Sequence, residues 1–142
     1  CAQIKKLPGF VDRRRENADY LRQQLLDLEG KIYLPEVDEN ANPSWFGFPI
    51  TVKEGVSRDA VVQALESNKI QTRMLFSGNL IKHPCFDEMR ASGQGYRVIG
   101  ELTDTDRTLY ETFWIGVYPG MKKEMLDYTV KVIKDAVHGG KG

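Results

Sequence analysis

The sequence lacks an excess of charge of one sign, a cysteine pattern and any long apolar run. Its 142 residues include 20 Lys and Arg and 20 Asp and Glu, so the formal net charge is zero. Proteins that bind nucleic acid usually carry a basic excess, so we expect no nucleic-acid partner. No apolar stretch approaches the roughly 20 residues that a membrane-spanning helix needs, and no signal peptide is recognisable, so we expect no membrane partner.

Motifs for catalysis or metal binding are missing as well. The two cysteines, Cys1 and Cys85, form no metal-binding spacing and no disulfide framework, and free thiols fit a reducing cytoplasm. His83 and Cys85 flank Pro84, a spacing that does not aim one side chain at the other, so we interpret them as a loop pair rather than a base and a nucleophile. The chain opens at Cys1 instead of a methionine, and we therefore expect a piece of a longer protein.

Hydrophobic periodicity predicts one α+β domain with helices on one face of a short, mainly antiparallel sheet. We expect residues 1–29 to form a helix that connects to another domain, residues 30–138 to form the domain itself, and residues 139–142 to be a disordered tail. Pro8-Gly9 should kink or interrupt the connecting helix, and Pro49 should place its strand at an edge or a bulge. The expected strands are 31–34, 44–52, 70–76 and 112–118. The expected helices are 10–29, 58–68, 84–89, 105–110 and 121–137.

Two of these strands carry aromatic residues on both faces. In 112–118, alternation places Phe113 with Ile115 and Val117 on one face and Trp114 on the other. In 44–52, the same rule places Phe46 and Phe48 together, opposite Trp45. A sheet with one solvated face should alternate apolar and polar side chains, so this pattern indicates that both faces are covered or that one binds a partner. The alternative is that Trp45 and Trp114 are core residues beneath a helix.

A polar cluster follows the strand at 70–76. Arg73 precedes the segment Ser77-Gly78-Asn79, whose donors could hold phosphate or sugar hydroxyls. The same residues are ordinary turn formers, so a structural role is the alternative. Arg107 has a similar ambiguity, because a helix that begins among acidic residues explains it without a ligand.

Four segments of the sequence resemble one known family. They are 44–50 (SWFGFPI), 71–80 (QTRMLFSGNL), 84–86 (PCF) and 113–121 (FWIGVYPGM). Together they resemble the C-terminal domain of the DegT/DnrJ/StrS family of pyridoxal-phosphate (PLP) sugar aminotransferases. Ordinary members carry a Tyr and a Pro-Leu-His in the loop where this chain has Phe76 and Asn79-Leu80. That departure makes the chain most similar to the CDP-4-dehydro-6-deoxyglucose 3-dehydratases of lipopolysaccharide biosynthesis.

The resemblance implies a fold, a reaction and partners. The fold would be the small C-terminal domain of a fold-type I PLP enzyme, whose large domain holds PLP or pyridoxamine phosphate (PMP); the fragment alone should bind no cofactor and be inactive. The parent would remove the C3 hydroxyl of a nucleotide-linked 4-keto-6-deoxyhexose in the cytoplasm, as a homodimer, with an iron–sulfur reductase as a possible partner. The alternatives are a sugar-nucleotide aminotransferase of the same family and, from a different class, a non-catalytic protein-interaction module.

The resemblance also implies which residues line the substrate site. The aromatic strand would face the sugar or cofactor, the loop after the next strand would line the sugar-nucleotide entrance, and an arginine further along would reach a substrate phosphate. No catalytic residue and no metal ligand is expected within this chain. The substrate-binding residues implied in this way are Trp45, Phe46, Phe48, Arg73, Phe76, Ser77, Asn79 and Arg107.

Overall fold

A four-stranded antiparallel sheet organises the structure, a computed structural model that describes residues 2–139. The strands lie in the order β1-β2-β4-β3, and every neighbouring pair is antiparallel. The longest pairing joins β2 to β4, from Gly47 opposite Gly116 to Thr51 opposite Thr112. The strands are β1 (Ile32–Tyr33), β2 (Gly47–Val52), β3 (Thr72–Met74) and β4 (Thr112–Gly116).

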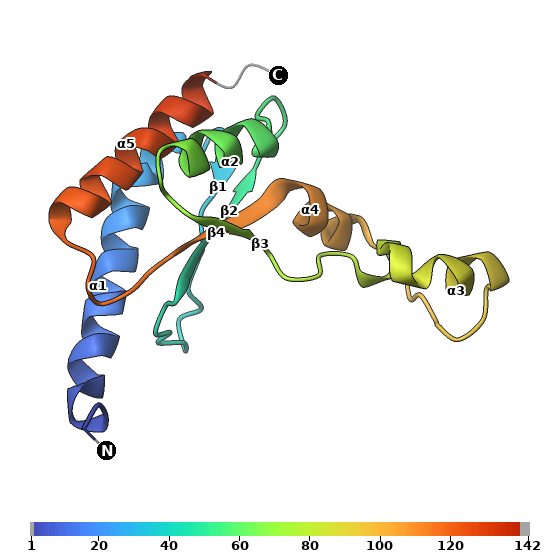
Figure 1. Ribbon diagram of the computed structural model, residues 1–142, viewed down its shortest axis with the longest axis horizontal. Coiled ribbons are helices and arrows are strands. Elements are labelled where there is room, and N and C mark those ends of the chain that lie inside the picture. The colour runs from blue at the N-terminus through green and yellow to red at the C-terminus, as the bar shows by residue number, and fades with distance from the viewer. Residues whose placement is uncertain (1, 140–142) are drawn as a thin grey trace.

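Three helices pack around this sheet, and two more belong to an arm that leaves it (Figure 1). The α-helices are α1 (Leu7–Leu25), α2 (Arg58–Ser67), α3 (Asp87–Ser92), α4 (Thr103–Glu111) and α5 (Lys123–Gly139). Short 3₁₀ turns are η1 (Ile4–Lys6), η2 (Leu26–Leu28), η3 (Leu80–Lys82) and η4 (Pro84–Phe86). Within residues 2–139, no helix is both long enough and apolar enough to cross a membrane.

The core lies between one face of the sheet and helices α1, α2 and α5. Alternate residues of β2 and β4 point into it, and the helices contribute apolar stripes at spacings of three and four. The largest fully buried side chains are Phe48, Phe113, Leu21, Leu25, Leu28, Ile32, Ile50, Leu65, Ile115, Ile133, Val61 and Val117. The predicted α+β class, with its antiparallel sheet, is confirmed.

Local signals account for the starts of α1 and α2. The Ser57 hydroxyl accepts a hydrogen bond from the Ala60 amide at 3.3 Å and caps α2. The expectation for Pro8 is wrong: it lies in the first turn of α1 and starts the helix instead of interrupting it. The first turn has free amides in any case, so the missing N–H of proline costs nothing there. The tail expected at 139–142 lies outside the described residues except for Gly139, which ends α5.

The prediction for Pro49 holds locally but not in the sheet as a whole. Strand β2 lies between β1 and β4, so it is not an edge strand. However, β1 pairs only with Thr51 and Val52, and at Pro49 the strand has a ladder partner on one side only. The missing amide hydrogen of Pro49 therefore leaves no ladder position unfilled on the β1 side.

The chain between β3 and β4 forms the arm, with α3 at its tip (Figure 1). The Arg90 guanidinium donates to the carbonyl oxygens of Ile81 and His83, the latter at 3.0 Å, which fixes α3 against the 3₁₀ turns. His83 Nε2 lies 2.6 Å from the Ser77 carbonyl oxygen, so this side chain is used in the loop itself. Cys85 is exposed and free, in agreement with the interpretation of a loop pair.

Candidate functional site

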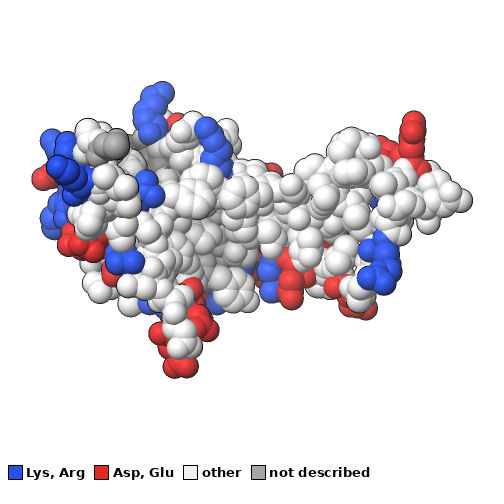
Figure 2. Space-filling view, turned by 90° about the horizontal axis from the view of Figure 1, so that it is seen from below, with Lys and Arg blue, Asp and Glu red and all other residues white. Residues whose placement is uncertain are grey.

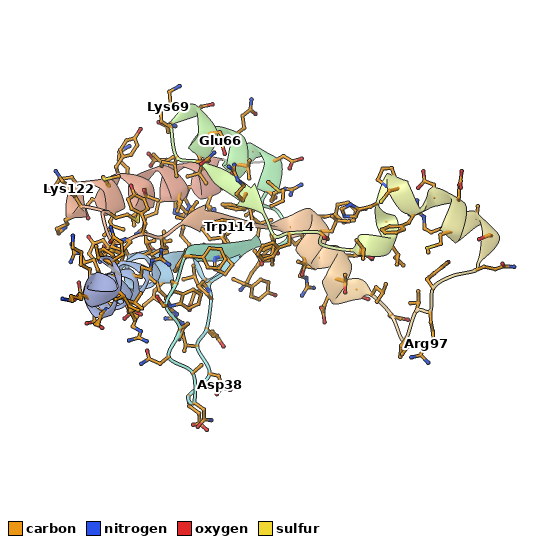
Figure 3. The ribbon with its side chains drawn as sticks, turned by 60° about the horizontal axis from the view of Figure 1, so that its bottom comes forward. Asp38, Glu66, Lys69, Arg97, Trp114 and Lys122 are labelled. Carbon is orange, nitrogen blue, oxygen red and sulfur yellow. The ribbon has the colours of Figure 1, made fainter. Side chains whose placement is uncertain are left out.

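The face of the sheet opposite the helices carries an aromatic hollow of about 270 Å³. Trp114 lines it and lies between the helical body and the arm (Figure 3). The hollow is lined by Pro43, Ser44, Trp45, Phe46, Gly47, Pro49, Leu75, Phe76 and Trp114. None of these side chains is charged, so the hollow suits an apolar or aromatic surface rather than an isolated ion.

Trp114 is held in place from three directions. Its indole Nε1 donates to the Met74 carbonyl oxygen at 3.2 Å, across the β3–β4 pairing. The Phe46 ring meets it edge to face, with centroids 5.5 Å apart and planes at 78°, a favoured aromatic geometry. The ring also lies on Gly47, where a Cβ atom would come within 2.6 Å of Trp114 Cε3. The indole is therefore a fixed wall of the hollow.

Phe76 lines the hollow at the start of the arm. Its backbone has φ of +47°, an uncommon conformation for a non-glycine residue, and its side chain is 76% exposed. Two hydrogen bonds hold this turn: the Phe76 amide donates to Met74 O at 2.8 Å and the Gly78 amide donates to Leu75 O at 3.1 Å. The turn thus directs a large aromatic side chain to the surface.

Gly78 and Asn79 attach this turn to α4. Gly78 has φ of +52°, and a Cβ atom there would lie 2.6 Å from the Leu109 Cα atom, so only glycine fits. Asn79 is 2% exposed, and its Nδ2 donates to Asp106 Oδ1 at 2.7 Å. The expectation that Asn79 lines an entrance is therefore wrong, because its side chain is buried and its amide nitrogen is used within the chain.

Asp106 also forms an ion pair with Lys82, at 2.7 Å. The Lys82 ammonium, followed by the Asn79 amide, holds the pKa of the Asp106 carboxyl below its usual range. The hydrogen bond to Asp106 likewise raises the pKa of Lys82. These three side chains, which we call the arm latch, join the start of the arm to α4 at its end.

Phe48 provides the second correction. It is 1% exposed and belongs to the core, so it does not face a substrate. Phe46, in contrast, is 58% exposed and contacts Trp114 on the open face. The sequence rule placed the two residues on one face because it assumed a regular strand from residue 44. Strand β2 begins only at Gly47, and the chain before it does not follow strand alternation.

Arg73 lies beside a second groove, of about 420 Å³, that shares Trp114 with the aromatic hollow. Lys69, Gln71 and Tyr118 also line this groove. The β3 strand that carries Arg73 is fixed by Glu66, whose Oε1 accepts from the Thr72 amide at 2.6 Å and from its hydroxyl at 2.7 Å. These donors, first the amide and then the hydroxyl, lower the pKa of Glu66.

Arg107 forms ion pairs with carboxylates of its own helix, α4. Its guanidinium lies 3.4 Å from Glu111 and 3.8 Å from Asp104, at spacings of four and three residues along α4. It also lies 6.0 Å from the centre of the Tyr33 ring. Arg107 does not line the aromatic hollow, so its expected reach to a substrate phosphate is not supported by this arrangement.

The structure therefore brings together part of the predicted set. Trp45, Phe46 and Phe76 line one hollow, exposed Ser77 follows directly, and Arg73 lies in the adjoining groove. The prediction omitted Trp114, Leu75 and Pro49. For Trp114 a signal was present, since alternation in its strand already placed it opposite the core-facing Phe113.

The described residues do not fit a complete cofactor site. The lining of the aromatic hollow has no lysine to bond a pyridoxal aldehyde and no carboxylate to hold a pyridine nitrogen. Nor do residues 2–139 contain a group of three or more His, Cys, Asp or Glu side chains arranged to bind a metal ion. The lining residues can form one wall of a binding site, but they supply no group for the cofactor's chemistry.

A family comparison agrees with this arrangement. The sequence profile described as the DegT/DnrJ/EryC1/StrS aminotransferase family matches residues 1–134. The chain belongs to this family. The chain spans only about 30% of the length of the two relatives described next.

Two relatives are similar over nearly the whole chain. The lipopolysaccharide biosynthesis protein RfbH of Salmonella typhimurium is 48% identical over 136 residues, which are 94% of this chain and 30% of that protein. The dTDP-4-dehydro-2,6-dideoxy-D-glucose 3-dehydratase of Saccharopolyspora spinosa is 42% identical over 138 residues, or 96% of this chain and 29% of that protein.

Solved structures show the same fold. A GDP-4-keto-6-deoxymannose-3-dehydratase with a trapped PLP-glutamate geminal diamine superposes with a TM-score of 0.78 at 28% identity, covering 93% of this chain and 33% of that one. DesV of S. venezuelae, solved with a ketimine intermediate, has a TM-score of 0.78 at 16% identity, with 96% of this chain and 34% of that one covered. The second likeness shows the fold alone.

Proposed function

We propose that this chain is the small C-terminal domain of a PLP- or PMP-dependent enzyme that removes the C3 hydroxyl of a nucleotide-linked 4-keto-6-deoxyhexose. The relatives with the highest identities reported above are a lipopolysaccharide biosynthesis protein and a sugar 3-dehydratase. Lipopolysaccharide O-antigen synthesis is the proposed context. The cofactor, the proton-transferring group and the homodimer contacts then belong to the remaining part of the parent.

The observation that carries the proposal is the uncharged aromatic hollow on the sheet face opposite α1, α2 and α5. Trp45, Phe46 and Phe76 line it together with Trp114. Aromatic faces of this kind bind sugar and base rings by stacking, while the adjoining Arg73 supplies a cation for a diphosphate. The domain's proposed task is to bind and orient the nucleotide sugar and to exclude water from one side of the cleft.

Absorbance spectroscopy tests whether the cofactor is held by the rest of the parent and not by this chain. The full-length protein should show a cofactor band when PLP is added, and the 142-residue chain should show none. A chain that retained stoichiometric cofactor would contradict the proposal, since the aromatic hollow has no group to hold it.

Steady-state kinetics on the full-length protein tests the role of the hollow. Phe76→Ala and Trp45→Ala should each raise KM for the nucleotide sugar by roughly tenfold, the effect of losing one good aromatic contact. Tyr128→Phe on α5, outside the hollow, serves as the control. Unchanged KM values in both hollow variants would remove the substrate role.

The competing reaction is amino transfer by the same family. Its discriminating feature is the residue at the Schiff-base position of the parent: histidine favours the dehydratase and lysine favours the aminotransferase. An iron–sulfur reductase as electron donor is proposed only with the dehydratase. The dehydratase is supported if the deoxygenated sugar forms only when an iron–sulfur reductase is present and no amino group is transferred.

A further inference from the structure

The turn that carries Phe76 lies where the arm leaves the body formed by the sheet with α1, α2 and α5. In Figure 2 the arm projects from the body, and most of the surface at their junction is uncharged. Within residues 75–111, all of which the structure describes, no apolar side chain is buried, and the one buried residue is Asn79. A hydrophobic core therefore contributes little to fixing this turn, and its hydrogen bonds carry more of that role.

The peptide unit between Ser77 and Gly78 is held at both of its polar atoms. Its nitrogen, the Gly78 amide, donates to the Leu75 carbonyl oxygen at 3.1 Å. Its oxygen, the Ser77 carbonyl, lies 2.6 Å from His83 Nε2. A carbonyl oxygen can only accept, so His83 Nε2 carries a proton, as it does in one neutral tautomer and in the protonated ring. The contact is therefore an N–H···O hydrogen bond that requires no particular charge on the imidazole.

The backbone of His83 is itself fixed, which gives its ring a defined starting point. Pro84 follows and disfavours helical conformations of the residue before it, and His83 has φ of −71° and ψ of 142°. The Arg90 guanidinium donates to the His83 carbonyl oxygen at 3.0 Å and to that of Ile81. A side chain anchored in this way is well suited to hold a neighbouring loop.

The conformation of Phe76 needs such a restraint. Its φ of +47° is uncommon for a residue with a large side chain and persists only where the surrounding structure imposes it. Phe76 directly precedes Ser77, so releasing the Ser77 carbonyl oxygen would allow the turn to relax and redirect the phenyl ring. That ring lines the aromatic hollow together with the neighbouring Leu75.

We propose that His83 is a positioning residue of the aromatic hollow. Its hydrogen bond to the Ser77 carbonyl oxygen holds the turn in which Phe76 can contact the nucleotide sugar. The inference rests on the proposed function, which makes the hollow one wall of the substrate site. His83 does not itself line the hollow, so it acts on the substrate only through Phe76.

Steady-state kinetics of the full-length protein compares three substitutions of His83. His83→Leu removes the donor, His83→Gln keeps an N–H group at a similar reach, and His83→Asn carries the same amide on a side chain one methylene shorter. His83→Leu and His83→Asn should raise KM for the nucleotide sugar several-fold, up to the roughly tenfold predicted for Phe76→Ala, at unchanged kcat. His83→Gln should keep a KM close to that of the wild type. His138→Leu is the matched control, because this histidine lies on α5 and contacts Lys31.

A double variant separates positioning from a general structural role. If His83 acts through Phe76, His83→Leu should not raise KM further once Phe76→Ala is present, whereas independent effects would multiply. Hydrogen–deuterium exchange of a peptide that contains Gly78 reports on the contact itself, whatever the protein's function. Exchange should be faster in His83→Leu and unchanged in His83→Gln.

The inference is wrong if His83→Leu keeps the wild-type KM while Phe76→Ala raises it, or if the two effects multiply. Equal KM values for His83→Gln and His83→Leu would show that the donor is irrelevant, and a lower kcat at unchanged KM would place His83 at the reacting atoms; either result overturns the positioning role. The proposed function fails separately: wild-type KM values in both Phe76→Ala and His83→Leu, with faster exchange in His83→Leu, would refute the substrate role of the hollow and retain the contact.

Discussion

The indole of Trp114 lies directly on Gly47 of the neighbouring strand. A Cβ atom at Gly47 would approach Trp114 Cε3 to 2.6 Å, closer than carbon atoms pack. The two residues are diagonal neighbours, since Gly47 pairs with Gly116 and Trp114 pairs with Pro49. A residue without a side chain at this position of β2 therefore allows the indole to lie against the strand and form a wall of the hollow.

Gly47→Ala should displace Trp114 and open the aromatic hollow. We expect a loss of stability of about 1–3 kcal/mol, typical of overpacking, and a change in tryptophan fluorescence. Gly116→Ala is the matched control, because it lies opposite Gly47 in the same ladder and a Cβ atom there meets nothing within 4 Å. Equal effects of the two substitutions in urea unfolding would show that strand propensity, and not the Trp114 contact, is responsible.

The clamp between Glu66 and Thr72 should control how firmly β3 is held. Glu66→Gln weakens two charge-assisted hydrogen bonds, so the Thr72 amide should exchange with solvent faster in native-state hydrogen exchange. Thr72→Val removes only the hydroxyl bond and should have a smaller effect on neighbouring amides of β3. If Glu66→Gln left β3 protection unchanged, the clamp would have no energetic role.

Secondary structure was largely predictable because its signals are local. The Ser57 cap, the apolar stripe of α2 and the alternation in β4 each depend on residues within a few positions of one another. These signals placed every strand and the longer helices within a few residues of where they lie. Pro8 was misjudged because the same residue breaks a helix in its interior and starts one in its first turn.

The site was only partly predictable because it depends on distant partners. Ser-Gly-Asn has the same composition whether the asparagine is exposed or buried, and Asp106, its partner, is 27 residues away. Phe46 and Phe48 could not be separated by alternation, since the irregular segment before Gly47 follows no period.

Phe48→Ala and Phe46→Ala separate the core from the open face. Phe48 is fully buried, so its truncation should destabilise the 142-residue chain by about 3–5 kcal/mol. Phe46 is largely exposed and loses one edge-to-face contact with Trp114, so its truncation should cost about 0.5–1.5 kcal/mol. Urea unfolding measures both. A larger loss for Phe46 than for Phe48 would mean that the two side chains are placed on the wrong faces.

The ion pair between Asp106 and Lys82 in the arm latch should make the stability of the protein depend on pH. The pKa of Asp106 is lowered, so the folded state binds its proton less readily than the unfolded state does. Its contribution to stability is therefore complete above the ordinary pKa of 3.8 and is lost as the pH falls through the lowered value. The pKa of Lys82 is raised, so its contribution is complete below 10.5 and is lost as the pH rises through the raised value.

Asp106→Asn should therefore destabilise the protein at neutral pH and become indistinguishable from wild type once the pH passes below the lowered pKa of Asp106. The substituted amide still offers one oxygen to Asn79 but turns an N–H donor toward the Lys82 ammonium, so the difference reports the loss of the ion pair with Lys82. Asp104→Asn, on the same helix but with its side chain almost fully exposed, is the control and should show little pH-dependent difference. Urea unfolding at several pH values measures all three proteins. If the stability difference for Asp106→Asn persisted unchanged into acid, the ionised carboxylate of Asp106 would not be its cause.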